Sequence, residues 1–485
     1  MSSRATPGRT GPAGSRRPLA MLIALAAVLA LGGCGPLGGS SAGTAVISPD
    51  AARATVPAGS PAATPVTTAP VSSPSIAAAA ASPTPDARAA VVAAANRFMR
   101  AFAAGDYAAQ WAQLDPGEQA IWPSPTDRAS FLTAKFGGRV AGFQLGTPRL
   151  AASWTSHEDT AYTVGHPWQV PVSVTFSDAS ALQPTGVAAS YGKLALNLRL
   201  DPATGAVTVA GEGPASLDAP LITPGHPAGR TESVPILMYH RVAPLPQRSA
   251  WTDSYGYQIE YGLTVPPDQF AAEMDDLVSR GYHAISLTRL SDALLYGLPL
   301  PAHPIVLTFD DGRQSPWFNA VPVLRQHGFT GEFFACAGFV GETNQTAAHL
   351  NVQRYLTWDQ ISGLNADGFW VEDHGQKDQQ VLWGLSRSGL AAEVGQSAQA
   401  LVDHTGRALQ FVAYTGALWP YPQANQSGPA EQQLFVNLAA LGYAGGVLDT
   451  RVPSTRESSS QLFQLPRIRV APGQTTAGFE SSLQP

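Results

Sequence analysis

The residues with the clearest chemical potential are two adjacent carboxylates, Asp310 and Asp311, directly after the apolar stretch VLTF (306–309). Unpaired carboxylates are costly to bury, and neighbouring side chains on a strand point to opposite faces. Gly312 follows them and permits the bend that would bring both to one site. Such a pair suits a division of labour in which one carboxylate binds a divalent metal and the other takes a proton from the metal's water. Helix capping is the competing explanation, and it accounts for one Asp more readily than for two.

The segments around this pair alternate between short apolar strands and amphipathic helices. Strands are predicted at 234–239, 284–287 and 305–309, and further helix–strand pairs at 315–335, 357–372, 386–414 and 429–448. Repeated βα units indicate an α/β fold with a mainly parallel sheet or barrel, whose functional site lies at the C-terminal ends of the strands. Asp310 and Asp311 stand at such an end.

Several motifs of this region resemble one known family. TFDDG, the upstream VPILMYHRV, GYHAISLTRL and the terminal LPRIRV are similar in order and spacing to the polysaccharide deacetylases, the NodB-like carbohydrate esterase 4 family. The branch that they resemble includes the poly-N-acetylglucosamine deacetylases. The resemblance covers residues 233–485 and implies a distorted (β/α) barrel of NodB type. It also implies one divalent metal ion, often zinc, and removal of acetyl groups from amino sugars or other glycans.

The family's metal and base positions can be carried over residue by residue. The resemblance implies that Asp310 is the general base, and that Asp311 and His374 are metal ligands. Asp378 stands where the family has its second histidine, and positions four apart share one face of a helix turn. An Asp/His/Asp set is harder than Asp/His/His, which shifts the metal preference from zinc toward manganese or magnesium. Gly375 replaces the usual Ser or Thr after the first histidine.

Two further residues are predicted to assist catalysis. The late histidine that acts as an acid in many relatives is missing, since no histidine follows His404. His240, in MYHRV at a neighbouring strand end, is therefore the candidate acid. Arg467, in LPRIRV, is predicted to orient Asp310.

Aromatic residues near these motifs are candidates for substrate binding. Tyr414 lies in FVAYTG, which only partly matches the family's RPPYG-like motif because Val412 takes the usual arginine position. Trp419 and Tyr421 follow shortly after. Sugar rings stack on such side chains, so Tyr414, Trp419 and Tyr421 are predicted to contact the glycan. Packing in the core is the competing interpretation.

The N-terminus has the pattern of an exported lipoprotein. A basic flank precedes the apolar run 19–31, which is shorter than the roughly 20 residues of a membrane span. LGGC then resembles a lipobox, so residues 1–33 are predicted to be a signal peptide and Cys34 to be lipidated. Residues 34–85, rich in Ala, Ser, Thr and Pro, are predicted to form a disordered tether. The other cysteine, Cys336, is predicted to be a buried small hydrophobe.

A smaller unit is predicted between the tether and the barrel. Helical spacing after Asp86, with a stop at Gly105, precedes alternating strands at 169–176 and 193–200. This order favours a small α+β domain over residues 86–216, which resembles the NTF2-like domains of exported bacterial proteins. A Pro- and Gly-rich linker is predicted at 217–232.

These patterns favour a metal-dependent deacetylase that removes N-acetyl or O-acetyl groups from a cell-envelope or extracellular polysaccharide. The alternative is a catalytically degenerate, glycan-binding lipoprotein; the intact Asp pair favours the enzyme, and Asp378 and the altered FVAYTG favour the alternative. The net charge of −6 carries no footprint of a nucleic-acid binder, and the oligomeric state is not indicated. The expected location is the outer face of the bacterial cytoplasmic membrane, through a lipid on Cys34.

Overall fold

The computed structural model describes most of the chain after residue 84. The described ranges are 85–179, 186–220, 229–251, 253–344, 353–377, 382–415, 429–449 and 453–484. The chain divides into two units, Met1–Ala78 and Ala79–Pro485. Every element described below belongs to the second unit, and Cys34 lies outside the described residues. No helix within the described ranges is both long and apolar enough to cross a membrane.

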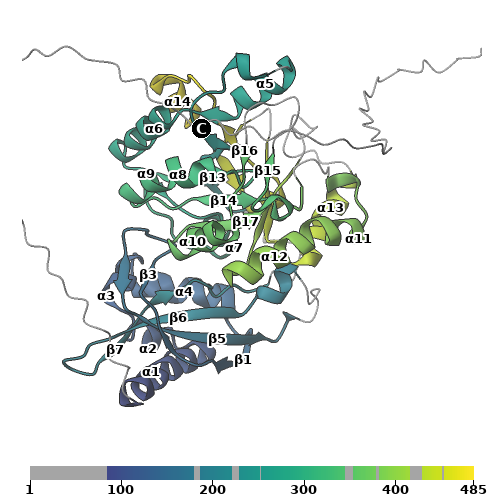
Figure 1. The fold of residues 1–485 in the computed structure, drawn as a ribbon. Helices are drawn as coiled ribbons and strands as arrows, with labels where there is room; N and C mark the ends of the chain where they lie inside the picture. Colours follow the sequence, from purple (N-terminus) through teal and green to yellow (C-terminus); the bar gives the residue numbers. More distant parts are fainter. Residues whose placement is uncertain are drawn as a thin grey trace, which may run out of the picture. The chain divides into compact units, whose positions relative to one another are not determined.

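The first part of this unit is an α+β domain, drawn in purple to blue in Figure 1. Its helices are α1 (Pro85–Ala104), α2 (Tyr107–Trp111), α3 (Pro116–Ala120) and α4 (Pro125–Phe136). Its strands are β1 (Val140–Leu145), β2 (Arg149–Leu150), β3 (Ser153–Thr155), β4 (Thr163–Gly165), β5 (Trp168–Phe176), β6 (Lys193–Leu200) and β7 (Val207–Glu212). The sheet runs β1-β5-β6-β7 with antiparallel pairing, as the alternating pattern predicts.

The core of the α+β domain follows from residue spacing. Val91, Phe98 and Phe102 lie on one face of α1 and are buried, since they recur at helical intervals. α1 ends at Ala104, and Gly105 follows with a φ of 71°, the left-handed conformation that glycine adopts without strain. On β5, burial alternates from residue to residue, so one face of the sheet packs on the helices.

The second part is an α/β barrel domain, drawn in teal to yellow in Figure 1. Its helices are α5 (Ser254–Gly262), α6 (Pro267–Ser279), α7 (Leu287–Tyr296), α8 (Ser315–Asn319), α9 (Val321–Gln326), α10 (Trp358–Ala366), α11 (Arg387–Leu390), α12 (Gln396–Thr405), α13 (Pro429–Leu441) and α14 (Thr476–Ser482). The strands of its main sheet are β9 (Ile236–Tyr239), β12 (His283–Ala284), β13 (Pro304–Phe309), β14 (Glu332–Ala335), β17 (Trp370–Asp373), β18 (Phe411–Ala413), β19 (Gly445–Leu448), β21 (Leu465–Pro466) and β22 (Ile468–Arg469). Short pairs outside this sheet are β8 (Thr231–Ser233) with β20 (Arg456–Ser458), β10 (Arg241–Val242) with β11 (Thr264–Val265), and β15 (Thr343–Asn344) with β16 (Gln353–Arg354).

The main sheet curls into a nearly closed parallel barrel. Its strand order is β21-β19-β18-β17-β14-β13-β9-β22, and the pairs along this path are parallel. The two edge strands, β21 and β22, are separated in the sequence by Arg467 alone. One short segment therefore pairs with β19 at one edge and with β9 at the other, which brings the two edges together. The predicted distorted (β/α) barrel is confirmed.

One predicted strand is shorter than expected. The stretch 284–287 forms only the end of the two-residue strand β12, and Leu287 already begins α7. The cause is local, because the Ser286 side chain accepts a hydrogen bond from the Arg289 amide and caps the helix.

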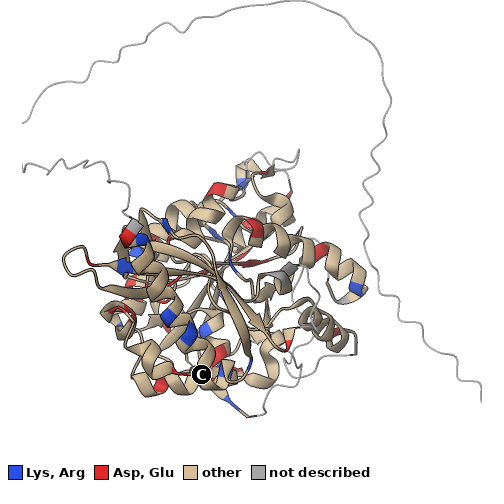
Figure 2. Cartoon of the chain, turned by 90° about the horizontal axis from the view of Figure 1, so that it is seen from below, with Lys and Arg blue, Asp and Glu red and all other residues tan. Residues whose placement is uncertain are grey.

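Charged residues also occupy the interior of the barrel domain. Acidic and basic residues are interspersed in the view of Figure 2. Arg407, Arg467, Glu332 and Glu372 are each at most 1% exposed. Cys336 is likewise buried, as predicted, and its thiol donates to the His374 carbonyl at 3.4 Å.

A buried acid on α6 makes the stability of the fold depend on pH. Burial raises the pKa of Glu273 to about 7, although hydrogen bonds from Gln269 and Tyr239 oppose the rise. An unfolded glutamate titrates near 4.3, so between these values the folded chain holds a proton that the unfolded chain releases. The contribution of Glu273 to the free energy of unfolding is therefore complete below pH 4.3 and is lost as the pH rises through 7.

We therefore expect Glu273→Gln to gain about 2 kcal/mol of unfolding free energy over the wild type between pH 5 and pH 8. The glutamine keeps the hydrogen-bonding shape without titrating, so its stability should change less over this range. Urea denaturation of both chains at the two pH values measures the difference. If the unfolding free energies of the two chains change equally between pH 5 and pH 8, Glu273 is ionised in the folded protein over this whole range, which contradicts the prediction.

Candidate active site

The predicted catalytic residues meet at the C-terminal ends of the barrel strands. Asp310 and Asp311 follow β13, His240 follows β9, and His374 follows β17. Arg467 lies between β21 and β22, where the two edges of the sheet meet. Parallel strands end at a common edge, which explains how residues more than a hundred positions apart come into contact.

The chain bends sharply at the two carboxylates. Asp311 has a φ of 69° and Gly312 a φ of 65°, so both adopt the left-handed conformation. A side chain at Gly312 would also come within 3.3 Å of Ala335. The bend ends the strand's alternation and lets both carboxylates turn toward the site, as the sequence predicts.

Asp310 is held by Arg467 in a paired, buried geometry. Two guanidinium nitrogens of Arg467 donate to the two oxygens of Asp310 at 2.6 and 2.7 Å. Arg467 also donates to the hydroxyl of Thr308 at 3.1 Å and to the carbonyl of Leu448 at 3.2 Å. The predicted contact between Arg467 and Asp310 is confirmed.

This pairing keeps Asp310 ionised. Burial by itself would raise the pKa of the Asp310 carboxyl, but Arg467 and, to a smaller extent, His374 more than offset it, so the pKa lies below its ordinary value. Asp310 is therefore a carboxylate at neutral pH, which is the form that can accept a proton.

The two carboxylate oxygens of Asp311 face different partners. Its Oδ2 accepts from Arg313 Nε at 3.0 Å, and its Oδ1 lies 3.5 Å from His374 Nε2. Arg313 lies 4.7 Å from the ring centre of Tyr355. Burial opposes ionisation of Asp311, yet Arg313 and the nearby histidines hold its pKa well below the usual range.

The tautomer of His374 follows from its neighbours. Its Nδ1 lies 2.9 Å from the carbonyl oxygen of Ala413, which can only accept, so Nδ1 carries the proton. In the neutral ring, Nε2 then bears the lone pair and faces Asp311 Oδ1. A backbone carbonyl commonly fixes the ring of a metal-binding histidine in this way.

The spacing of Asp311 and His374 fits two ligands of one ion. Ligand distances of about 2.0–2.2 Å around a tetrahedral ion put neighbouring ligand atoms about 3.4 Å apart, close to the observed 3.5 Å. No group of three His, Cys, Asp or Glu side chains within the described ranges could hold a metal. The predicted third ligand, Asp378, lies outside the described residues.

A second layer of contacts fixes the loop that carries His374. Asp373 accepts from Ser397 at 2.5 Å, from the Gly375 amide at 2.9 Å, and from the Tyr443 hydroxyl. Gly375 has a φ of 74°, so a Ser or Thr at this position would strain the backbone. This geometry accounts for glycine in place of the usual Ser or Thr.

His240 lies at the edge of the site. Its Nε2 is 3.9 Å from Asp310 Oδ2. Burial lowers the pKa of His240, although Asp311 and Asp310 oppose the shift, so the ring is neutral at pH 7. A neutral ring is a weaker proton donor than an imidazolium, and the acid role of His240 stays a prediction.

Of the predicted aromatic contacts, only Tyr414 lies in the described ranges, and its assignment to the substrate is wrong. Tyr414 is 5% exposed and its hydroxyl donates to the Phe463 carbonyl at 2.8 Å. The side chain packs in the core with Phe435 because it follows the buried strand β18 directly. Trp419 and Tyr421 lie outside the described residues.

Four contacting residues were not predicted from the sequence: Arg313, Thr308, Ser397 and Tyr443. Arg313 could have been found from its place two positions after Asp311, since a cation beside a carboxylate pair suggests pairing. Ser397 and Tyr443 carry no local signal, because they reach Asp373 across 24 and 70 positions.

Comparison with known families agrees with this site. Residues 298–426 match the family model described as Polysaccharide deacetylase. This match identifies residues 298–426 as a polysaccharide deacetylase domain. Members of this family are hydrolases that act on carbon–nitrogen bonds. Asp310, Asp311 and His374 of the deacetylase domain lie inside the matched span, whereas His240 and Arg467 lie outside it.

Individual relatives of the deacetylase domain were also found. YxkH of Bacillus subtilis (strain 168), a protein classed with the polysaccharide deacetylases, is 23% identical over 251 residues, which are 52% of this chain and 76% of the relative. The deacetylase PplD of Streptococcus pyogenes, solved with acetate, is 21% identical and covers 53% of this chain and 100% of its own, with a TM-score of 0.41. IcaB of Ammonifex degensii is 22% identical and covers 53% and 98%, with a TM-score of 0.39.

Proposed function

We propose that this protein is a metal-dependent deacetylase that removes N-acetyl or O-acetyl groups from a cell-envelope or extracellular polysaccharide. The observation that carries the proposal is the arrangement of two carboxylates with different partners. Asp310 is locked by Arg467, and Asp311 lies 3.5 Å from His374. Asp310 is thereby kept available as a base, and Asp311 is placed beside His374 to bind a metal.

The chain's own residues supply the proton handling. Asp310 is ionised and can take a proton from the attacking water, and Arg467 orients it by donating hydrogen bonds to both of its oxygens. His240, whose Nε2 lies 3.9 Å from Asp310 Oδ2, is the proposed donor to the leaving amine.

Asp311 and His374, with Asp378 as the proposed third ligand, would hold the divalent ion. When bound, the ion would lower the pKa of a water and polarise the acetyl carbonyl. Zinc follows from the family resemblance, while the second carboxylate at position 378 favours manganese or magnesium.

Metal analysis of the full chain tests the proposed ligands. After loading with Zn²⁺ or Mn²⁺ and removal of the excess, we expect about one ion per chain by elemental analysis. Asp311→Ala and His374→Ala should each lose it, because each removes one of the few ligand atoms. Glu342→Ala, which changes an exposed acid in the same domain, is the matched control. A wild type that stays metal-free would contradict the metal-dependent mechanism.

We also propose that the protein is exported and lipid-anchored through Cys34 to the outer face of the bacterial cytoplasmic membrane. The support is the basic flank, the short apolar run and LGGC in the sequence. We expect wild-type protein in the membrane fraction and Cys34→Ala in the soluble fraction. Equal distribution of the two chains would rule out the anchor.

A further inference from the structure

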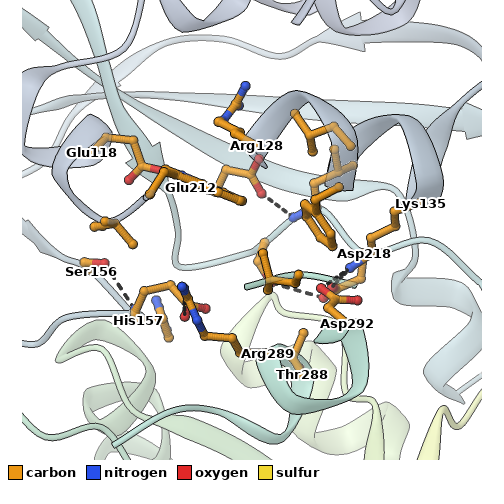
Figure 3. A pocket seen from close by; sticks show the side chains of 18 of the residues that line it. Glu118, Arg128, Lys135, Ser156, His157, Glu212, Asp218, Thr288, Arg289 and Asp292 are labelled. Carbon is orange, nitrogen blue, oxygen red and sulfur yellow. Dashed lines mark hydrogen bonds and ion pairs between the residues drawn. The ribbon is translucent and has the colours of Figure 1, made fainter. Parts of the chain in front are cut away.

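A cavity lined by charged and aromatic side chains lies away from the proposed catalytic residues. Its volume is about 170 Å³, and it is lined by the α+β domain together with α7 and the first residue of β17, Trp370. The catalytic residue His374 follows the last residue of the same strand. The cavity and the catalytic residues therefore lie at opposite ends of β17. Figure 3 shows the lining side chains converging from both domains.

Acidic groups outnumber basic groups around this cavity. The charged residues that line it are five carboxylates and three cations: Glu118, Glu158, Glu212, Asp218, Asp292, Arg128, Lys135 and Arg289. Lys135 Nζ lies 2.8 Å from Asp292 and 3.8 Å from Asp218, and Arg289 lies 3.1 Å from Glu158. These two clusters account for two of the cations and three of the acids.

The remaining carboxylates, Glu118 and Glu212, both interact with Arg128, and Glu212 also interacts with Lys135. Burial raises the pKa of Glu118 to about 8 and also raises that of Glu212, even though Arg128 lowers both. Arg128 itself donates to the side-chain oxygen of Gln110 at 2.9 Å. The raised pKa leaves the Glu118 carboxyl largely protonated at pH 7, and a cation bound beside it would favour the ionised form.

The cavity also contains polar atoms that lack partners. Within the described part of the chain, Arg128 Nε, Thr288 Oγ1 and Arg289 Nε have no hydrogen-bond partner. The three residues are 7, 6 and 9% exposed, and each lines the cavity. Buried polar atoms are normally paired, so these atoms are available to form hydrogen bonds with the hydroxyl or other acceptor groups of a bound ligand.

Aromatic side chains form much of the remaining wall. Trp122, Phe131, Trp154 and Trp370 all line the cavity. Tryptophan faces attract cations and pack against the apolar faces of sugar rings. A ligand that combines positive charge, hydroxyl groups and a compact ring would satisfy all three features.

We propose that this cavity binds a hexosamine with a free amino group, its ammonium facing Glu118 and Glu212 and its hydroxyls facing Arg128, Thr288 and Arg289. An N-acetylated sugar would bring no charge to the carboxylates and would add bulk to a cavity that has room for about one small ring. The inference rests on the proposed function only for the origin of the ligand, because removal of the acetyl group from an N-acetylated amino sugar produces the free ammonium group. The site would therefore distinguish product from substrate.

Calorimetric titration of the full chain tests the proposal with three probes. D-Glucosamine should bind at least about 10-fold more tightly than N-acetyl-D-glucosamine, which shares its ring but not its charge. Glycine, whose ammonium is balanced by its own carboxylate, should bind no better than the acetylated sugar. Equal binding of the two sugars, or no binding of glucosamine, would overturn the proposal. Tighter binding of glycine would show that the site takes an amino acid instead and would also overturn it.

A matched pair of variants locates the binding. Glu118→Gln keeps the size of the side chain and should weaken glucosamine binding at least about 10-fold. Asp106→Asn removes one carboxylate from the exposed start of α2 in the same domain and should leave binding unchanged, because Asn caps helices as well as Asp. Unchanged binding by Glu118→Gln would overturn the site assignment. The comparison of sugars uses the wild type and does not depend on the folding of a variant.

The same titration with Asp310→Asn separates this proposal from the proposed function. Asp310 belongs to the other end of the barrel, so the variant should bind glucosamine like the wild type. If the wild type releases no acetate from any substrate but binds glucosamine selectively, the deacetylase proposal fails and the binding site stands. If acetate is released without selective binding, the binding site fails alone.

Discussion

Replacing Asp310 by Asn should lower the rate of acetate release from N-acetylglucosamine oligomers by about 10²–10⁴-fold, the usual contribution of a general base. Asparagine keeps the shape of the side chain and one acceptor oxygen for Arg467, but it cannot take a proton at neutral pH. Because Asp310 is ionised in the folded protein, the wild type begins each cycle with its base in the active form. The variant should also keep its metal content, since Asp310 is not among the proposed ligands.

The control for this experiment is the Glu342→Ala chain, which changes an exposed residue and should keep wild-type activity. Acetate release is measured at saturating metal, and thermal unfolding confirms that each chain is folded. Wild-type activity in Asp310→Asn would exclude Asp310 as the base and would move that role to another group at the strand ends.

Replacing Arg467 by Met should destabilise the barrel domain by about 3–5 kcal/mol, the usual cost of leaving one partner of a buried ion pair alone. The Arg467 side chain is 0% exposed and makes bonds to Asp310, Thr308 and Leu448. Without the guanidinium, burial would dominate the pKa of Asp310 and raise it, so a smaller fraction of the residue would be ionised and able to accept a proton. The shift in the urea midpoint of the full chain measures the first effect.

The double variant Asp310→Asn with Arg467→Met distinguishes the lost charge from lost packing. Removing both charges should restore part of the stability, because no buried carboxylate is left alone. If the double variant is as unstable as the sum of the two single variants, the pair contributes through packing and not through charge.

The sequence was sufficient to predict the barrel and the location of its site. Strand alternation and helix spacing placed Asp310 and Asp311 after a buried strand, and the resemblance carried by TFDDG assigns them the roles of base and ligand, which stay predictions. The pairing of Arg467 with Asp310 was also predicted, across 157 positions, because LPRIRV is part of the same resemblance. The positions of these residues were predictable because they depend on local periodicity and on motifs that recur in a fixed order.

The sequence could not predict which residues form hydrogen bonds with the buried carboxylates. Arg313 takes one oxygen of Asp311, and Tyr443 reaches Asp373 from 70 positions away. Tyr414 is a core residue and not a substrate contact. The sequence could not predict this, because the burial of Tyr414 depends on which side of β18 packs against the neighbouring helices.

What the sequence alone determined is the set of short-range relations: strand, bend, adjacent carboxylates and the closing segment around Arg467. Only the tertiary structure decided the partners of each charge and the cavity between the α+β domain and α7. Arg128 and Glu118 from one domain and Thr288 and Arg289 from the other line that space. The physical reason is that periodicity specifies which face of an element is buried. Which groups are buried against each other depends on packing between distant elements, and the same packing sets the pKa of each buried charge.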